Sequence, residues 1–136
     1  MAITEKLLVE KADGIGTLTL NQPSKRNAIS FEMWRDFPEA MADLEDDPDV
    51  RVIVLTGAGD KAFSAGADIS EFGEYRSTPK QRALYQDYEH ATTSSLRSSK
   101  KFVIARIDGV CVGGGAEVAL DCDCLLYTSD AADEGH

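Results

Sequence analysis

The chain has 136 residues and a net charge of −10, since 24 acidic residues outnumber 14 Lys and Arg residues. This acidity argues against binding to a nucleic-acid backbone, which needs a basic surface. A hydrophobic fraction of 43% is ordinary for a globular domain, and no apolar stretch is long enough to cross a membrane. The N-terminus has no basic segment followed by an apolar block, and three cysteines are too few for a disulfide framework. We therefore expect one cytoplasmic domain.

The first elements are predicted to be a hairpin and a helix. Residues 7–11 and 15–20 are short runs rich in β-branched residues, and the Asp-Gly pair between them is typical of a hairpin turn. Ser30 is placed to cap a helix that ends near residues 46–48. Pro38 falls inside this helix and should kink it. The helical spacing predicts a buried face made of Trp34, Phe37, Met41 and Leu44.

Two later runs, residues 50–56 and 102–107, are nearly continuous in apolar residues. Such runs are typical of strands buried on both faces of a parallel sheet, and parallel strands belong to βαβ units. The sequence thus predicts an α/β fold. Thr78, Pro79 and Gln81 mark the start of a long helix between the two strands. The helical spacing places Leu84, Tyr88, Ala91 and Ser95 on one face of this helix.

Two loops rich in small residues follow buried strands. They are residues 64–68 (SAGAD) and residues 112–117 (VGGGAE), the second of which opens a last helix to about residue 121. Ligands of parallel sheets bind outside the carboxyl ends of the strands. Amides at a helix start are unpaired and attract negative charge, so two that converge would form an oxyanion hole. A tight turn is the alternative for either loop alone, and neither loop fits a phosphate-binding glycine motif.

Glu117 lies in an apolar segment about one turn into the last predicted helix. Burying a carboxylate is costly unless the group is paired or functional, which makes Glu117 a candidate catalytic residue. The alternative is a first-turn glutamate that interacts with the helix dipole. No metal site is predicted, because Cys122, Cys124 and His136 are too sparse to bind zinc.

The last residues do not continue the pattern. The segment that begins Cys124-Leu-Leu-Tyr resembles the translation of a transposase adapter used in sequencing libraries, whereas a natural gene is expected to continue from Asp123 into another strand. We therefore interpret residues 1–123 as the N-terminal part of a domain and residues 124–136 as an artefactual tail. A native acidic C-terminus is the alternative.

Three motifs in order carry a family resemblance: residues 21–30 (NQPSKRNAIS), 62–69 (AFSAGADI) and 107–117 (IDGVCVGGGAE). Together they resemble the enoyl-CoA hydratase/isomerase (crotonase) superfamily, over residues 3–123 and only its N-terminal half. The resemblance implies a spiral of ββα units, here truncated, that binds acyl-CoA thioesters in a homotrimeric or hexameric parent. Phe102 and Arg106 depart from the family pattern, which usually has a proline and a small residue there.

By position, the resemblance places the two oxyanion-hole amides at Ala67 and Gly114 and a catalytic carboxylate at Glu117. A second glutamate is expected at or just beyond residue 136. Substrate and coenzyme A contacts are expected at Lys25, Ala65, Gly66, Asp68, Ile69 and Gly113. For Lys25, a solvated loop lysine is the alternative.

The implied activity is that of an enoyl-CoA hydratase, which adds water to trans-2-enoyl-CoA. Coenzyme A is part of the substrate, and no cofactor, metal, nucleic acid or membrane is implied. The truncated chain itself is expected to be inactive. One alternative is an isomerase or another lyase of the same fold, and another is a non-catalytic acyl-CoA-binding module.

Overall fold

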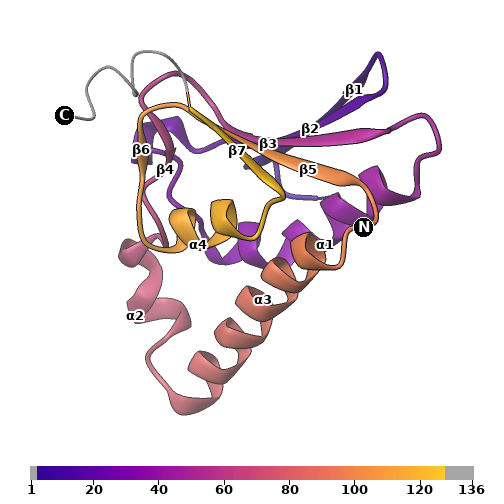
Figure 1. Ribbon diagram of the computed structural model, residues 1–136. Helices are drawn as coiled ribbons and strands as arrows, with labels where there is room; N and C mark the ends of the chain where they lie inside the picture. The colour runs from indigo at the N-terminus through magenta and orange to yellow at the C-terminus, as the bar shows by residue number, and fades with distance from the viewer. Residues whose placement is uncertain (1–2, 128–136) are drawn as a thin grey trace.

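The computed structural model describes residues 3–127, which form a mixed sheet with helices packed on one face (Figure 1). The main sheet has five strands in the order β1-β2-β3-β5-β7, and β4 pairs with β6 in a separate small sheet. The strands are β1 Leu7–Ala12, β2 Ile15–Leu20, β3 Val52–Gly57, β4 Ala62–Ser64, β5 Phe102–Ile107, β6 Val110–Cys111 and β7 Cys124–Tyr127. The helices are α1 Phe31–Asp46, α2 Phe72–Tyr75, α3 Pro79–Arg97 and α4 Gly114–Leu120, with short 3-10 helices η1 Pro23–Lys25 and η2 Ile69–Glu71.

The predicted hairpin is confirmed. β1 and β2 pair antiparallel, and the turn places Asp13 at φ 54° and Gly14 at φ 81°. Such positive φ angles are what an Asp-Gly turn tolerates best. β2, β3, β5 and β7 then run parallel to one another, so their carboxyl ends lie along one edge of the sheet.

Helix α1 has the predicted cap, and the four residues predicted to form its buried face are all buried. The Ser30 hydroxyl accepts a hydrogen bond from the Met33 amide at 3.3 Å. Pro38 lies inside the helix and has no N–H to donate to the Trp34 carbonyl one turn earlier. Thr92 of α3 supplies the missing donor, with its hydroxyl 3.0 Å from the Trp34 oxygen.

Helix α3 begins as predicted, with Thr78 and Gln81 forming a capping box. Of the face marked by the sequence, Tyr88 packs partly against the core and Ser95 is half-buried, but the most buried face lies one residue further along. The buried residues are Tyr85, Thr92 and Leu96, whereas Leu84 and Ala91 are exposed. Thr92 is fully buried between α3 and α1, where its hydroxyl donates to the Trp34 carbonyl. A prediction from hydrophobic spacing counts threonine as polar and therefore places it on the solvent-exposed face.

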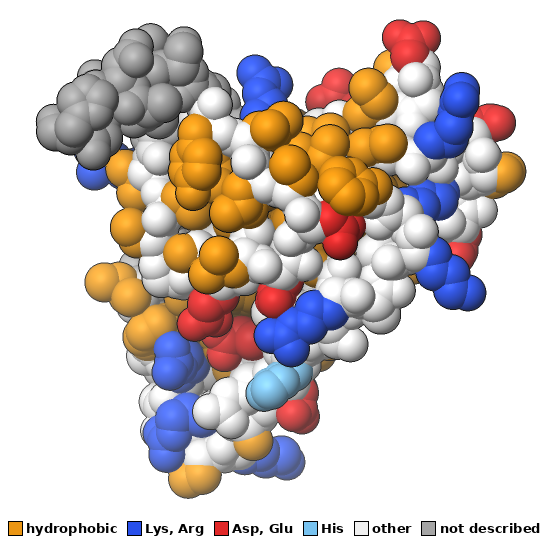
Figure 2. Space-filling view, viewed as in Figure 1, with side chains coloured by type: hydrophobic (Ala, Val, Ile, Leu, Met, Phe, Trp, Pro, Cys, Tyr) orange, Lys and Arg blue, Asp and Glu red, His pale blue; other side chains and the backbone are white. Residues whose placement is uncertain are grey.

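The two central strands are buried on one face, which corrects the expectation that both faces are buried. Ile53, Leu55, Val103 and Ala105 face the helices and are 0% exposed. On the other face the neighbouring side chains are half-buried or exposed, and Phe102 reaches 52%. No element among residues 3–127 covers that face, and Figure 2 shows hydrophobic side chains gathered over β5 and β7.

The chain does continue from Asp123 into a strand. Cys124–Tyr127 form β7, which pairs parallel with β5. Residues 128–136, most of the segment interpreted as a tail, lie outside the described residues, and the origin of that segment stays a prediction. Among the residues described, no helix is long and apolar enough to cross a membrane.

Candidate functional site

The two loops singled out in the sequence meet at one place. β4 and β6 pair in parallel, so the loop that follows β4 and the loop that follows β6 leave the small sheet at the same end (Figure 1). A hydrogen bond from the Val112 amide to the Ser64 carbonyl, at 3.2 Å, continues this pairing into the loops. The second loop leads directly into α4, so the first amides of that helix face the first loop.

The amides of Ala67 and Gly114 are brought together. A Cβ atom built on Gly114 would lie 3.6 Å from the Ala67 nitrogen, and one built on Gly66 would lie 3.4 Å from the Gly114 nitrogen. Within residues 3–127, neither amide donates a hydrogen bond. Two neighbouring free N–H groups are suited to bind an oxygen atom that gains negative charge.

The segment before α1 holds the first loop in this position. The Ala65 amide donates to the Arg26 carbonyl, and the Asp68 amide donates to the Ile29 carbonyl, each at 2.9 Å. The Ile29 amide donates in turn to the Gly66 carbonyl at 2.7 Å. These bonds engage the backbone on either side of Ala67 and leave its own amide available.

Each of the three consecutive glycines is required for a different structural reason. Gly113 has φ 56° and ψ −129°, a conformation that disfavours any side chain. A Cβ on Gly114 would lie 3.2 Å from the Trp34 ring, and one on Gly115 would lie 2.6 Å from the Ser64 Cβ. The close approach of α4 to α1 and β4 therefore depends on these glycines.

Glu117 lies one turn beyond Gly114 and lines a groove between α3 and α4 of about 600 Å³. The side chain is exposed, whereas its neighbours Val118 and Ala119 are buried. The premise that its carboxylate is buried among apolar residues is therefore wrong, and its catalytic role stays a prediction. The groove is lined by Gln86, Glu89, His90, Thr93, Arg97, Glu117, Leu120 and Asp121.

A second carboxylate of this groove, Glu89, is one that the sequence did not reveal. Burial raises the pKa of Glu89, and the nearby charge of Glu117 raises it further, although Arg76 and His90 oppose the shift. Asp121, by contrast, is paired with Arg97 at 2.8 Å. Glu89 lies on α3 and Glu117 on α4, so no local spacing in the sequence relates them.

Lys25 is fixed beside the first loop. Its Nζ lies 3.1 Å from the Asp68 carboxylate and 3.2 Å from the Ser70 hydroxyl. The Asp68 side chain is only 5% exposed, whereas that of Lys25 is 48% exposed. Burial opposes the charged form of Asp68, but the hydrogen bonds from Ser70 and Lys25 together hold its pKa below the ordinary value. Ile69, in the same loop, is 75% exposed.

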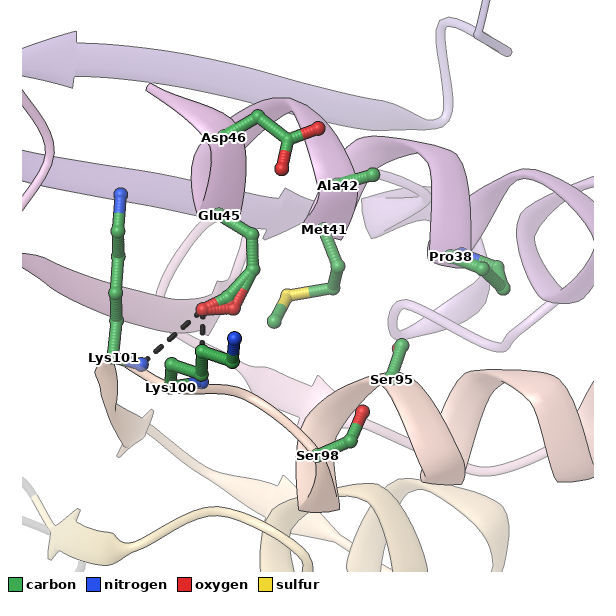
Figure 3. A pocket seen from close by; sticks show the side chains of 9 residues that line it. All are labelled: Pro38, Met41, Ala42, Glu45, Asp46, Ser95, Ser98, Lys100 and Lys101. Atoms are coloured by element: carbon green, nitrogen blue, oxygen red, sulfur yellow. Dashed lines mark hydrogen bonds between the residues drawn. The ribbon is translucent and has the colours of Figure 1, made fainter. Parts of the chain in front are cut away.

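A larger groove, of about 690 Å³, lies between the C-terminal halves of α1 and α3 (Figure 3). Figure 3 shows the Glu45 carboxylate turned toward the backbone of the turn before β5, where it accepts hydrogen bonds from the Lys100 and Lys101 amides at 3.0 and 3.2 Å. The Lys101 Nζ donates to the carbonyls of Leu44 and Asp47 at the end of α1. These contacts join α1 to β5, and the groove is separate from the Ala67–Gly114 pair.

Within residues 3–127, no cluster of His, Cys, Asp and Glu side chains is arranged to hold a metal ion. Cys111, Cys122 and Cys124 are free. The expectation that no cofactor is needed stays a prediction.

Known proteins share this fold and this sequence pattern. The profile of the family described as Enoyl-CoA hydratase/isomerase matches residues 10–133. A probable enoyl-CoA hydratase of Mycobacterium tuberculosis is 36% identical over 127 residues, which are 93% of this chain and 48% of that protein. A peroxisomal Delta(3,5)-Delta(2,4)-dienoyl-CoA isomerase of Arabidopsis thaliana is 34% identical over 125 residues, covering 84% of this chain and 44% of that protein.

Solved structures agree with the sequence matches. The crystal structure of an enoyl-CoA hydratase/carnithine racemase from Magnetospirillum magneticum superposes with a TM-score of 0.87 and 38% identity, over 91% of this chain and 46% of that chain. The chain thus spans about half the length of the relatives it matches. With a family profile matched over most of its length and the fold shared, the chain belongs to the enoyl-CoA hydratase/isomerase family.

Proposed function

We propose that the protein represented by this chain is an enoyl-CoA hydratase, which adds water to trans-2-enoyl-CoA thioesters. The observation that carries the proposal is the pair of free, adjacent amides of Ala67 and Gly114. Such a pair suits a reaction in which a carbonyl oxygen gains negative charge. Glu117 lies one turn further along α4 and is the proposed acid–base group.

The proposed chemistry follows the flow of charge. The oxygen of a water molecule bonds to C3 of the enoyl group, and the electrons of the double bond move toward the thioester oxygen. The Ala67 and Gly114 amides donate hydrogen bonds to that oxygen, and one such donor typically contributes about 3 kcal/mol to the transition state. Glu117 accepts the proton that water loses, and C2 takes up a proton from the second glutamate expected at or beyond residue 136.

The remaining features of the proposal follow from the family. Coenzyme A enters as part of the substrate, with contacts at Lys25, Ala65, Gly66, Asp68, Ile69 and Gly113. No further cofactor or metal is required. We further propose that the full-length protein is a cytoplasmic homotrimer or hexamer, and that catalysis needs the second glutamate as well as Glu117.

The first alternative is an isomerase or another lyase of the same family, since the family description itself names both hydratase and isomerase. An isomerase would use the same two amides but would move a proton between carbons rather than add water. The second alternative, an acyl-CoA-binding module without catalysis, needs the amides and the loop but not Glu117.

The test uses the full-length protein, in which the sequence after Asp123 is the one that the source gene encodes. A hydratase converts crotonyl-CoA into a product heavier by one water, as mass spectrometry would detect. An isomerase instead converts a 3-enoyl-CoA into the conjugated 2-enoyl-CoA with no change in mass. Binding of crotonyl-CoA without either reaction would support the non-catalytic module, and absence of binding would reject all three.

A further inference from the structure

The buried carboxylate of Asp68 adjoins both ends of the proposed binding site. It directly follows Ala67 in the chain, and its own amide is fixed by the Ile29 carbonyl at 2.9 Å. Its side chain faces Lys25 on one oxygen and Ser70 on the other. A carboxylate that is 5% exposed and bonded in this way has no free oxygen directed to a ligand.

The two oxygens of Asp68 have different partners. Oδ1 accepts hydrogen bonds from the Ser70 hydroxyl at 2.5 Å and from the Ser70 amide at 3.2 Å, which closes the turn into η2. Oδ2 accepts from the Lys25 Nζ at 3.1 Å, which links the loop to the end of η1. Hydrogen bonds to a charged group are stronger than neutral ones, and partial burial reduces their screening by water.

The Lys25 ammonium remains accessible although it is held in place. Its side chain is 48% exposed, and its partner Asp68 lies one residue from the free Ala67 amide. A fixed ammonium beside a thioester site is suited to bind an anionic part of the same ligand, such as a phosphate. Lys25 alone would be a flexible surface cation, and Asp68 gives it a defined position.

We propose that Asp68 is a positioning residue that fixes both the loop carrying the Ala67 amide and the ammonium of Lys25, so that the thioester and the phosphates of one acyl-CoA are bound in register. This inference rests on the proposed function, because it presumes an acyl-CoA ligand. The Asp68 side chain touches neither the thioester nor the phosphates, and the coenzyme A contact proposed at this residue is made by its backbone.

The test compares two ligands that share the thioester but differ in phosphates, crotonyl-CoA and crotonyl-pantetheine. Their binding to the full-length protein is measured by calorimetry. Lys25→Met should lower the affinity for crotonyl-CoA about tenfold and leave the affinity for crotonyl-pantetheine unchanged, because only phosphate contacts are lost. Asp68→Asn should lower the affinity for both ligands about tenfold, because the asparagine side chain has one acceptor oxygen where the carboxylate has two.

Two further variants make the comparison decisive. Lys11→Met removes a surface lysine that pairs with Asp43 and Asp47, far along the chain from the loop, and should leave both affinities within about twofold. Ser70→Ala removes only a hydroxyl, so it tests the same turn if Asp68→Asn does not fold, and it should weaken crotonyl-pantetheine.

The outcomes separate the two proposals. If the unsubstituted full-length protein binds neither ligand, the proposed function fails. If it binds both, but Asp68→Asn and Ser70→Ala leave crotonyl-pantetheine unaffected, Asp68 does not position the loop and the inference is overturned. Unchanged binding of crotonyl-CoA by Lys25→Met overturns it as well.

Discussion

Replacing Thr92 with valine should destabilise the fold far more than the loss of one hydroxyl from a helix surface would. Thr92 is 0% exposed, and its hydroxyl is 3.0 Å from the Trp34 carbonyl, which Pro38 leaves without its helical donor. Valine keeps the shape but removes the donor, so a buried carbonyl loses its partner. The expected cost is about 1–3 kcal/mol of the free energy of unfolding. For a domain of this size, each kcal/mol lowers Tm by about 3–4 °C.

Thermal and urea unfolding followed by circular dichroism would measure this cost. Thr93→Val is the matched control, because the Thr93 hydroxyl bonds only to the His90 carbonyl of its own helix, and its cost should be within about 0.5 kcal/mol. Pro38→Ala restores an N–H for the Trp34 carbonyl, so Thr92→Val should cost less in that background, with a coupling of about 1 kcal/mol. Equal costs for Thr92→Val and Thr93→Val, or an unchanged cost in the Pro38→Ala background, would refute the reasoning.

Three further predictions concern the site. In the full-length protein, Glu117→Gln should lower kcat for crotonyl-CoA hydration by about 10²-fold or more with little change in affinity, and an unchanged kcat would favour the helix-dipole role. Ala67→Pro removes one amide and should lower kcat/KM by about 10²-fold, whereas Ala67→Ser should be milder; equal losses in two folded variants would argue against the amide. Because the pKa of Glu89 is raised above 4.5 in the folded state, the folded chain holds this proton to higher pH than the unfolded chain and loses stability as pH rises past 4.5. Glu89→Gln should therefore raise Tm at pH 7 but not at pH 4. A variant whose Tm equals that of the unsubstituted chain at both pH values would contradict the raised pKa of Glu89.

The parts of the fold that the sequence predicts well are those with a local cause. The Asp-Gly turn, the Ser30 cap and the capping box of Thr78 and Gln81 each satisfy backbone groups within a few residues. Their structures therefore depend little on the rest of the chain. The parallel arrangement of β3 and β5 is also predicted, since a long helix has to lie between parallel strands.

The prediction errors arise where the burial of a residue depends on a partner far away in the sequence. Thr92 is buried because a proline 54 positions earlier in the chain, Pro38, leaves a carbonyl unpaired. Among residues 3–127, no element covers the far face of β3 and β5. An apolar run indicates that a strand prefers burial, but it does not indicate which elements are present to bury it. Neither fact is contained in a window of neighbouring residues.

The candidate site shows the same division. The glycine pattern locates the two loops, because Gly66 at φ 100° and Gly113 at φ 56° need glycine for local reasons. Whether the amides of those loops meet depends on the parallel pairing of β4 with β6, and whether Ala67 is held depends on the segment before α1. Glu89 and the Lys25–Asp68 pair have no local signal, since each acts through a partner on another element. A sequence motif thus identifies the groups that can bind a thioester oxygen, whereas the residues that hold those groups in register emerge only when the elements are packed together.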